Sequence, residues 1–311
     1  MEDPIGFWVR VGLYLTLMPL FGLPAFALLG LRGDERRSGA VLPLTSIAGG
    51  LVITVALLSM LQIVTLAASM GGVPLATVDR VAVSAVLSAG AVGTAWKFRL
   101  AALVMMALAL PFLRRHPLPA LGVSSIAGAG ALGTVAWFGH GAMDEGTIGW
   151  VHLGADLLHL GAAGLWVGAL AVFSILILKQ ATTFDRAHLL LCERVLAGFA
   201  MIGTVVIAVL ILTGLINGWL LVGPANLWAL PGTAYGRLLI AKLILFAGML
   251  LLAAANRFRF TPALADAIAS GEGLVMAADH LRRSLIAETV CLIAIFIAVA
   301  WLGMLPPTGS S

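Results

Sequence analysis

Charged residues are what this sequence has least of. Only 10% of its 311 residues are Asp, Glu, Lys or Arg, whereas 61% are hydrophobic and the mean hydropathy is +1.09. A soluble domain carries about 25% charged residues, so a water-soluble fold of this composition would expose a large apolar surface. A lipid bilayer solvates such a surface. The composition therefore predicts an integral membrane protein.

Cysteine and enzyme motifs are also scarce. The two cysteines, Cys192 and Cys291, fall in or beside apolar segments and form neither a disulfide framework nor a CxxC metal motif. The sequence contains no GxxxxGK[ST], HExxH or GxSxG motif, so we expect neither an ATPase nor a hydrolase. A net charge of +4, carried by Arg-rich loops, does not indicate a nucleic-acid partner.

Long apolar stretches predict an all-α bundle of about eight transmembrane helices, because a spanning helix needs roughly 20 mostly apolar residues. The weaker stretch Val78–Trp96 is interpreted as an interfacial or partly inserted helix, and the whole of 1–311 as a single transmembrane domain. The first stretch has no small-residue cleavage site and is expected to be retained. The expected spans are Ile5–Leu31, Val41–Met70, Leu100–Leu113, Leu118–Phe138, Trp150–Leu178, Leu189–Leu221, Tyr235–Ala255 and Leu281–Leu305.

Loop charge predicts the orientation of these helices. Positive residues concentrate on the cytoplasmic side of membrane proteins. One set of loops holds twelve Lys and Arg residues, and the opposite set holds at most four, namely Arg80, Lys97, Arg99 and Arg237. The first set is therefore expected in the cytoplasm, with both termini in the periplasm. That set comprises Arg32, Arg36, Arg37, Arg114, Arg115, Lys179, Arg186, Arg194, Arg257, Arg259, Arg282 and Arg283.

Three polar residues of the fifth expected helix share one helical face. His152, Asp156 and His159 are spaced i, i+4 and i+7. If the helix begins on the outer side near Trp150, His159 lies roughly 14 Å deep at 1.5 Å per residue. Ionisable residues inside a membrane are costly and therefore often functional. Each single His could instead serve as a helix–helix hydrogen bond.

The residues just before this helix add further metal-binding chemistry. His140 ends the preceding helix, Met143 offers a thioether, and Asp144 with Glu145 would attract cations. Imidazole suits copper, zinc, iron and nickel, and a thioether favours Cu(I). We therefore expect His140, His152 and His159 to bind metal, with Met143, Asp144, Glu145 and Asp156 as possible accessory residues.

Other intramembrane polar residues allow two interpretations each. Lys242 could form an ion pair with Asp156, or its ammonium could snorkel to the interface. Glu288 could relay protons or metal, or simply pair with a neighbouring helix. Gly164 and Gly168 form a small-xxx-small pair that would let another helix approach closely.

Several continuous motifs stand out in the second half of the chain. They are GHGAM at Gly139–Met143, HLGADLLHLGAAGLWVGAL at His152–Leu170, YGRLLIAKLILF at Tyr235–Phe246, AAANRFRFTPAL at Ala253–Leu264, and LRRSLIAET followed by WLGMLPP. Together they resemble the copper resistance protein D (CopD) family, most clearly over residues 140–307. The first four helices resemble it more loosely, through their number and the segment GTAWKFRL.

The resemblance implies a multi-pass protein of the bacterial inner membrane that acts in copper homeostasis and moves copper toward the cytoplasm. It also implies a separate periplasmic copper-binding partner of the CopC type. Of the metal-binding positions, His140 and His159 match the family's motifs, and His152 matches less closely. Where the family is expected to have Gly-Gly after the Trp, this chain has Gly168-Ala169, a difference that concerns packing.

Two alternatives remain open from the sequence. Paired histidines can bind haem axially, so His140 with His159 or His152 could hold haem b in a quinone-linked oxidoreductase. The chain could also be a structural or assembly partner with no metal of its own.

Overall fold

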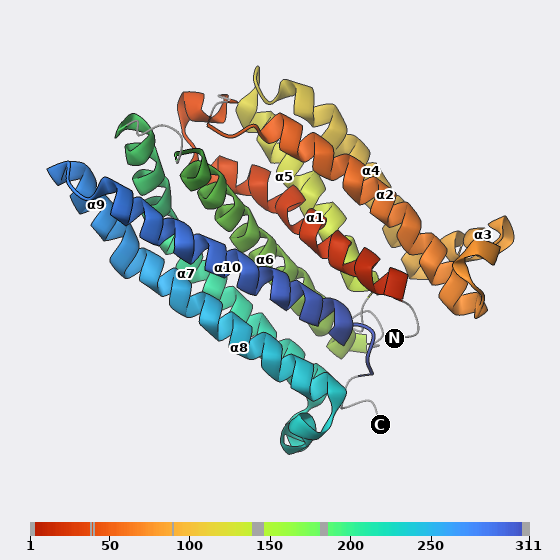
Figure 1. Cartoon of the computed structure of the whole chain (residues 1–311). Coiled ribbons are helices and arrows are strands. Elements are labelled where there is room, and N and C mark those ends of the chain that lie inside the picture. Colours follow the sequence, from red (N-terminus) through yellow and green to blue (C-terminus); the bar gives the residue numbers. More distant parts are fainter. Residues whose placement is uncertain are drawn as a thin grey trace.

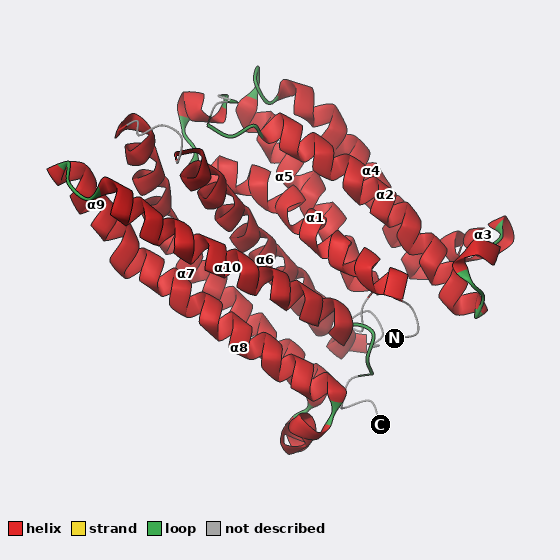
Figure 2. Ribbon diagram, in the orientation of Figure 1, coloured by secondary structure: helices red, strands yellow, loops and turns green. Residues whose placement is uncertain are grey.

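The protein is a bundle of long helices (Figures 1 and 2). The computed structural model describes residues 4–37, 39, 41–88, 90–138, 146–180 and 186–306, and this part contains no β-strand. Eight of its helices are long and apolar enough to cross a membrane, which confirms the predicted fold class. These spans are Pro4–Gly30, Leu44–Gly71, Gly90–Phe112, Pro117–Phe138, Gly146–Ile177, Arg186–Val222, Ala234–Ser270 and Leu274–Leu302.

The N-terminal half contains α1 to α5. Helix α3 is a short amphipathic helix beside the end of α2, and α4 and α5 each end in a 3₁₀ turn. Their bounds are α1 Pro4–Gly30, α2 Leu44–Gly71, α3 Arg80–Ser88, α4 Gly90–Ala109 with η3 Leu110–Phe112, and α5 Pro117–Gly133 with η4 Thr134–Phe138.

The third span was predicted to begin at Leu100, which is wrong. It begins at Gly90, where φ is +34° and the chain turns from α3 into α4. The Ala-, Gly- and Ser-rich composition hid this start, because such residues lower the hydropathy without preventing insertion. The expected helix Val78–Trp96 is thus divided between α3 and the first two turns of α4.

The C-terminal half contains α6 to α10. Helix α8 continues through a π-helical turn into α9, so this span is longer than the predicted Tyr235–Ala255, and α10 begins at Leu274 rather than Leu281. Their bounds are α6 Gly146–Gln180, α7 Arg186–Val222, η6 Pro224–Gly232, α8 Ala234–Ala255, η7 Asn256–Phe260, α9 Thr261–Ser270 and α10 Leu274–Leu302.

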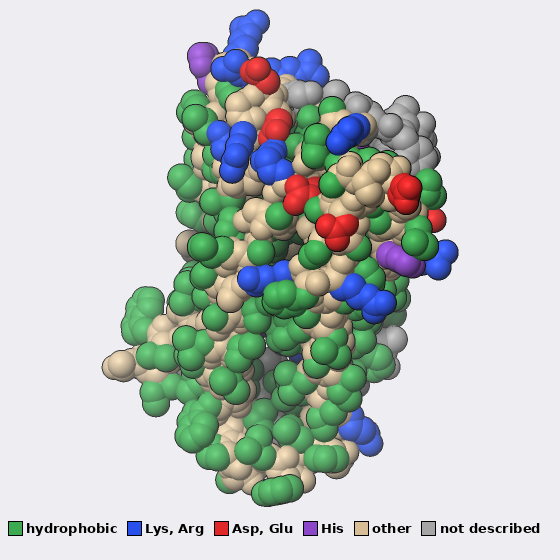
Figure 3. All heavy atoms as spheres, turned by 90° about the vertical axis from the view of Figure 1, so that its left-hand side faces the viewer, with side chains coloured by type: hydrophobic (Ala, Val, Ile, Leu, Met, Phe, Trp, Pro, Cys, Tyr) green, Lys and Arg blue, Asp and Glu red, His purple; other side chains and the backbone are tan. Residues whose placement is uncertain are grey.

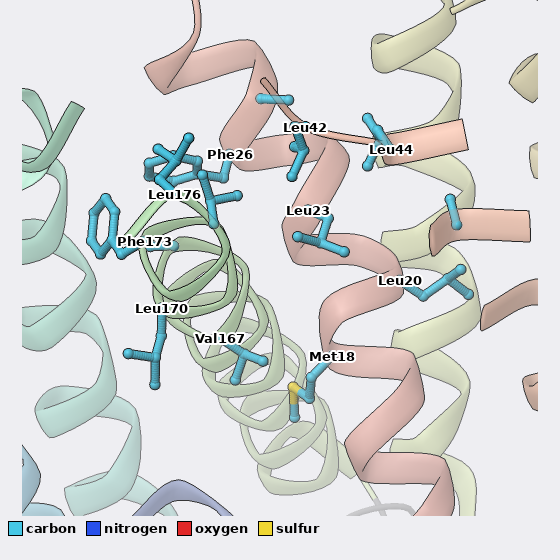
Figure 4. Packing of buried hydrophobic residues seen from close by; sticks show 14 of the residues in the cluster. Met18, Leu20, Leu23, Phe26, Leu42, Leu44, Val167, Leu170, Phe173 and Leu176 are labelled. Atoms are coloured by element: carbon cyan, nitrogen blue, oxygen red, sulfur yellow. The ribbon is translucent and has the colours of Figure 1, made fainter. Parts of the chain in front are cut away.

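Helix α1 joins the two halves. It packs against α2 and α5 on one side and against α6 and α10 on the other. Figure 4 shows Phe26 of α1 beside Phe173 of α6, and the two rings meet edge to face with centroids 5.4 Å apart. Met18 of α1 lies next to Val167 of α6 in the same view, and all four side chains belong to the main apolar core.

Glycines allow α1 and α6 to approach backbone to backbone. A Cβ added at Gly22 would lie 2.0 Å from the carbonyl oxygen of Gly164, and one added at Gly168 would lie 2.1 Å from the carbonyl group of Gly22. No side chain fits at such distances. The predicted close approach at Gly164 and Gly168 is therefore confirmed, and its partner is α1.

Arg99 is fully buried, although the sequence suggested a position near the membrane edge. Its side chain has 0% exposure and lies between α2, α4 and the end of α5. Nε donates to Thr134 Oγ1 (2.7 Å) and Nη1 donates to Gln62 Oε1 (2.8 Å), while the guanidinium lies 5.0 Å from the centre of the Phe138 ring. Arg99 therefore ties three helices together instead of reaching the interface.

The two ends of the bundle differ in charge. Helix α1 begins and α10 ends at the same end of the bundle (Figure 1), as an even number of spans requires. Figure 3 shows Lys, Arg, Asp and Glu gathered in the upper part of the visible face, above a largely hydrophobic band. The periplasmic location of the termini stays a prediction.

Replacing Gly168 with Ala is expected to destabilise the bundle by about 1–3 kcal/mol, the usual cost of overpacking. The new methyl group would collide with the α1 backbone at Gly22. Thermal unfolding of purified protein in detergent measures the effect. Gly161→Ala on the same helix is the matched control, because nothing lies within 4 Å of a Cβ there. Equal melting temperatures for both variants would contradict the proposed role of this contact.

Candidate functional site

The polar face of α6 lies in the bundle interior and turns toward α7 and α8. His152 is 1% exposed, and Asp156 and His159 are half-buried. The three residues follow one another at i, i+4 and i+7, as predicted, so they descend along the helix instead of meeting at one point. They form a string of polar groups inside a span whose other residues are mostly apolar.

Asp156 is held by α7. Its Oδ1 accepts a hydrogen bond of 2.5 Å from Asn217 Nδ2. The Oδ1 atom of Asn217 is buried and has no hydrogen-bond partner. A buried carboxylate needs such donors, because desolvation of the charge is costly. The side-chain oxygen of Asn217 can therefore still accept a hydrogen bond at the depth of Asp156.

His159 is also held by α7, and its partner defines its tautomer. His159 Nδ1 lies 2.9 Å from Thr213 Oγ1, and the Thr213 hydroxyl donates to the Val209 carbonyl oxygen at 2.6 Å. Since the hydroxyl proton is already used, Oγ1 accepts from Nδ1–H of the imidazole. This tautomer leaves the Nε2 lone pair available. Metal-binding histidines are commonly oriented in this way by a second hydrogen bond.

Further electrostatic interactions connect the polar residues of α6 with each other and with α8. Lys242 of α8 interacts electrostatically with both Asp156 and His159, and His152 interacts with Asp156. Tyr235 of α8 also interacts electrostatically with the Asp156 carboxylate. Asp156 accepts its hydrogen bond from Asn217, whereas its interaction with Lys242 is electrostatic, without a hydrogen bond between the two side chains. A direct Lys242–Asp156 ion pair therefore stays a prediction.

Part of the expected metal site cannot be placed. His140, Met143, Asp144 and Glu145 lie outside the described residues. Within the described ranges, no three His, Cys, Asp or Glu side chains converge on one point that could hold a metal ion. The metal-binding roles of His140, His152 and His159 stay predictions, and the described part supports single ligands at successive depths.

Glu288 lies apart from this string, in the middle of α10. Its side chain is 4% exposed, and its Oε1 accepts a hydrogen bond from Asn256 Nδ2 at the π-turn η7. Cys291 follows one turn later and is a free, half-buried thiol. The structure thus gives Glu288 the neighbouring-helix partner that a carboxylate at this depth requires.

The sequence did not identify Thr213 and Asn217 as hydrogen-bond partners of the α6 polar face. Both sit on α7, spaced i, i+4, and both contact the α6 polar face. Thr213 is an ordinary residue in membrane helices, and a single Asn such as Asn217 does not show which helix it faces. Their spacing on an otherwise apolar helix was the available signal.

Two family models match the chain. "Copper resistance protein D-like, N-terminal domain" covers residues 1–150, and "Copper resistance protein D" covers residues 193–302. The polar face of α6 lies between these matched ranges. The expectation of one domain over the full length stays a prediction. No solved structure matches the chain.

A curated relative spans the region between the models. "Copper resistance protein D" of Pseudomonas syringae pv. tomato is 41% identical over 310 residues, which are 99% of this chain and 98% of that protein. "Copper transport protein CutJ" of Bacillus subtilis (strain 168) is 30% identical over 167 residues, covering 52% of this chain and 29% of that protein. With eight apolar spans and a similarity that runs from end to end, this multi-pass membrane protein belongs to the copper resistance protein D family, as its motifs predicted.

Proposed function

We propose that this protein acts in copper homeostasis by carrying copper ions across the bacterial inner membrane from the periplasm toward the cytoplasm. Copper is the substrate of this transport, and the protein works as a carrier rather than as an enzyme. One observation supports the proposal in a chain of this family: His159 Nδ1 lies 2.9 Å from Thr213 Oγ1, whose hydroxyl donates to the Val209 carbonyl oxygen. In this arrangement His159 Nε2 would serve as a ligand inside the membrane.

Capture is proposed to occur at the outer end of α6. His140 and Met143 would supply nitrogen and sulfur ligands suited to copper. Asp144 and Glu145 would raise the local cation concentration. A separate periplasmic copper-binding protein of the CopC type would deliver the ion to this end.

Descent is proposed to follow the polar face of α6. Copper would pass from His152, beside Asp156, to His159. Single ligands at successive depths suit a path better than a closed cage, because an ion must bind well enough to enter and weakly enough to leave. If Lys242 carries its charge, it would oppose a cation near Asp156 and His159 and so favour such weak binding. Between ions, Lys242 would neutralise Asp156.

The inner half of the path is proposed to include Glu288, with Cys291 one turn further along α10. Glu288 lies in the inner half of the described bundle, and its carboxylate side chain is buried among helices. Its role would be to relay a proton or the ion toward the cytoplasm.

The alternative is a haem b held by two histidines. Such a site needs the two histidines on facing helices. The other described histidine of this face, His152, is on the same helix as His159, about two turns away. A haem site with two histidine ligands would therefore depend on His140.

The variant His159→Ala is expected to lower copper binding by the purified protein and to change copper content or copper tolerance of cells that express it. The variant removes the His159 imidazole, whose Nε2 is the proposed copper ligand inside the membrane. Metal analysis and optical spectra of wild type and variant measure this, and a Soret band without copper would favour haem. His116→Ala is the control, because His116 is exposed in the α4–α5 loop. Unchanged copper binding and cellular copper in a properly inserted His159→Ala protein would refute the proposal.

The variant Thr213→Val is expected to weaken copper binding by about tenfold, because partners that orient a metal-binding histidine typically contribute 10–100-fold in affinity. Valine keeps the side-chain volume but cannot accept from His159 Nδ1–H. Competition titration with a copper chelator measures the change. Thr54→Val on α2 is the control, since that exposed hydroxyl contacts only the carbonyl oxygen of Gly50. Equal affinities for the two variants would show that Thr213 does not position His159.

A further inference from the structure

A cavity of about 160 Å³ lies among α6, α7, η7 and α10, on the inner side of the polar face. Trp166 of α6 lines it seven residues beyond His159, which is roughly 10 Å further along the helix. Phe173, Phe199 and Leu170 form much of the remaining wall. The cavity is therefore apolar over most of its surface and separate from the α6 string of histidines.

Two buried polar side chains on the cavity wall come from different elements and carry oxygen acceptors. Glu288 and Asn256 both line the cavity, and they are 4% and 8% exposed. Asn256 uses its Nδ2 to donate to Glu288, so its Oδ1 remains as an acceptor, buried and without a partner. An unpaired buried carbonyl oxygen is costly unless a donor reaches it. A ligand that fits here needs a hydrogen-bond donor.

Aromatic rings on the opposite wall favour a flat ligand. Phe199 packs edge to face against Trp166 and Phe173, with centroid distances of 6.4 and 5.6 Å. Rings attract other rings in such offset or edge-to-face arrangements. The cavity volume is close to the roughly 150 Å³ of apolar protein cavities that accept benzene. A single substituted ring therefore matches both the walls and the size.

The cavity opens between α7 and α8 on the lipid-facing surface. These helices pack on different partners, α7 mainly on α6 and α8 mainly on α10. Lining residues from both sides, Thr204, Ala254 and Phe258, are exposed. Arg257 stands at this rim and donates to the Ala200 carbonyl oxygen and to Thr204 Oγ1. A ligand dissolved in the bilayer can reach the cavity by this side.

We propose that the cavity binds a membrane-dissolved ring compound with a hydroxyl donor, of the phenol or hydroquinone class. The hydroxyl donates to Glu288 or Asn256 Oδ1, and the ring lies against Trp166 and Phe199. An acyl chain fits the walls but leaves Asn256 Oδ1 unpaired. A metal cation that entered this cavity from the bilayer would have to pass the Arg257 guanidinium at the rim.

The test uses the full chain in lipid nanodiscs and two probes that differ in one group. 4-Ethylphenol is expected to bind at a saturable site severalfold more tightly than 4-ethylanisole, since a typical hydrogen bond contributes about 0.5–1.5 kcal/mol. Quenching of Trp166 fluorescence reports the binding, and its loss in Trp166→Phe assigns the signal. Empty nanodiscs correct for partition into lipid.

Variants locate the site. Glu288→Leu is expected to reduce phenol affinity severalfold through loss of the hydrogen-bond acceptor, and Ala253→Leu is expected to abolish binding by filling the cavity. Glu272→Leu is the control, because Glu272 is exposed between α9 and α10. Equal binding of the two probes to the wild-type protein overturns the proposal, whatever the variants do. So does unchanged binding in Ala253→Leu.

This inference does not depend on copper transport. His159→Ala is expected to retain phenol binding, because His159 does not line the cavity. Phenol binding without copper movement would leave this inference standing and the transport proposal refuted. Copper movement without phenol binding would leave the transport proposal standing and this inference refuted.

Discussion

The backbone contact between Gly22 of α1 and Gly164 and Gly168 of α6 is the constraint on which the rest of the bundle depends. Helix α1 packs on the N-terminal helices as well as on α6 and α10, so this contact joins the two halves of the chain. In lipid there is no hydrophobic drive between helices, and close backbone packing supplies much of the attraction. The contact also turns one face of α6 toward α1, which directs the polar face toward α7 and α8.

Hydrogen bonds between α6 and α7 then define the register of the site. The pairs His159–Thr213 and Asp156–Asn217 occur three residues apart on α6 and four residues apart, in the opposite direction, on α7. Two such pairs fix both the rotation and the sliding of antiparallel helices. The same bonds that satisfy polar groups in a water-free interior therefore also orient the groups proposed to meet copper.

Much of this protein could be predicted from its sequence. Hydropathy predicts the eight spans, helical spacing predicts the shared face of His152, Asp156 and His159, and small residues at Gly164 and Gly168 predict a close helix contact. These inferences succeed because each depends on one helix at a time. The family motifs succeed for the same reason, since each is a continuous stretch of sequence.

What could not be predicted depends on contacts between helices. The sequence does not show that Thr213 and Asn217 face α6, since this follows from the rotation of α7. Arg99 resembles an interfacial residue because a Lys and a loop precede it, yet Ser59, Gln62 and Thr134 on other helices supply the polar shell that buries it. The start of α4 at Gly90 was missed because its composition is weakly apolar.

The π-turn Asn256–Phe260 has a consequence for how this protein tolerates changes in length. A π-turn holds one more residue than an α-turn, which shifts the phase of the following helix by about 100°. Here it directs Asn256 inward, against Glu288, while Arg257, Phe258 and Arg259 are exposed. Removing one residue from this turn would restore a regular helix and rotate α9 out of step with α8. The π-turn thus determines the rotation of α9 relative to α8, and its length is as important as its composition.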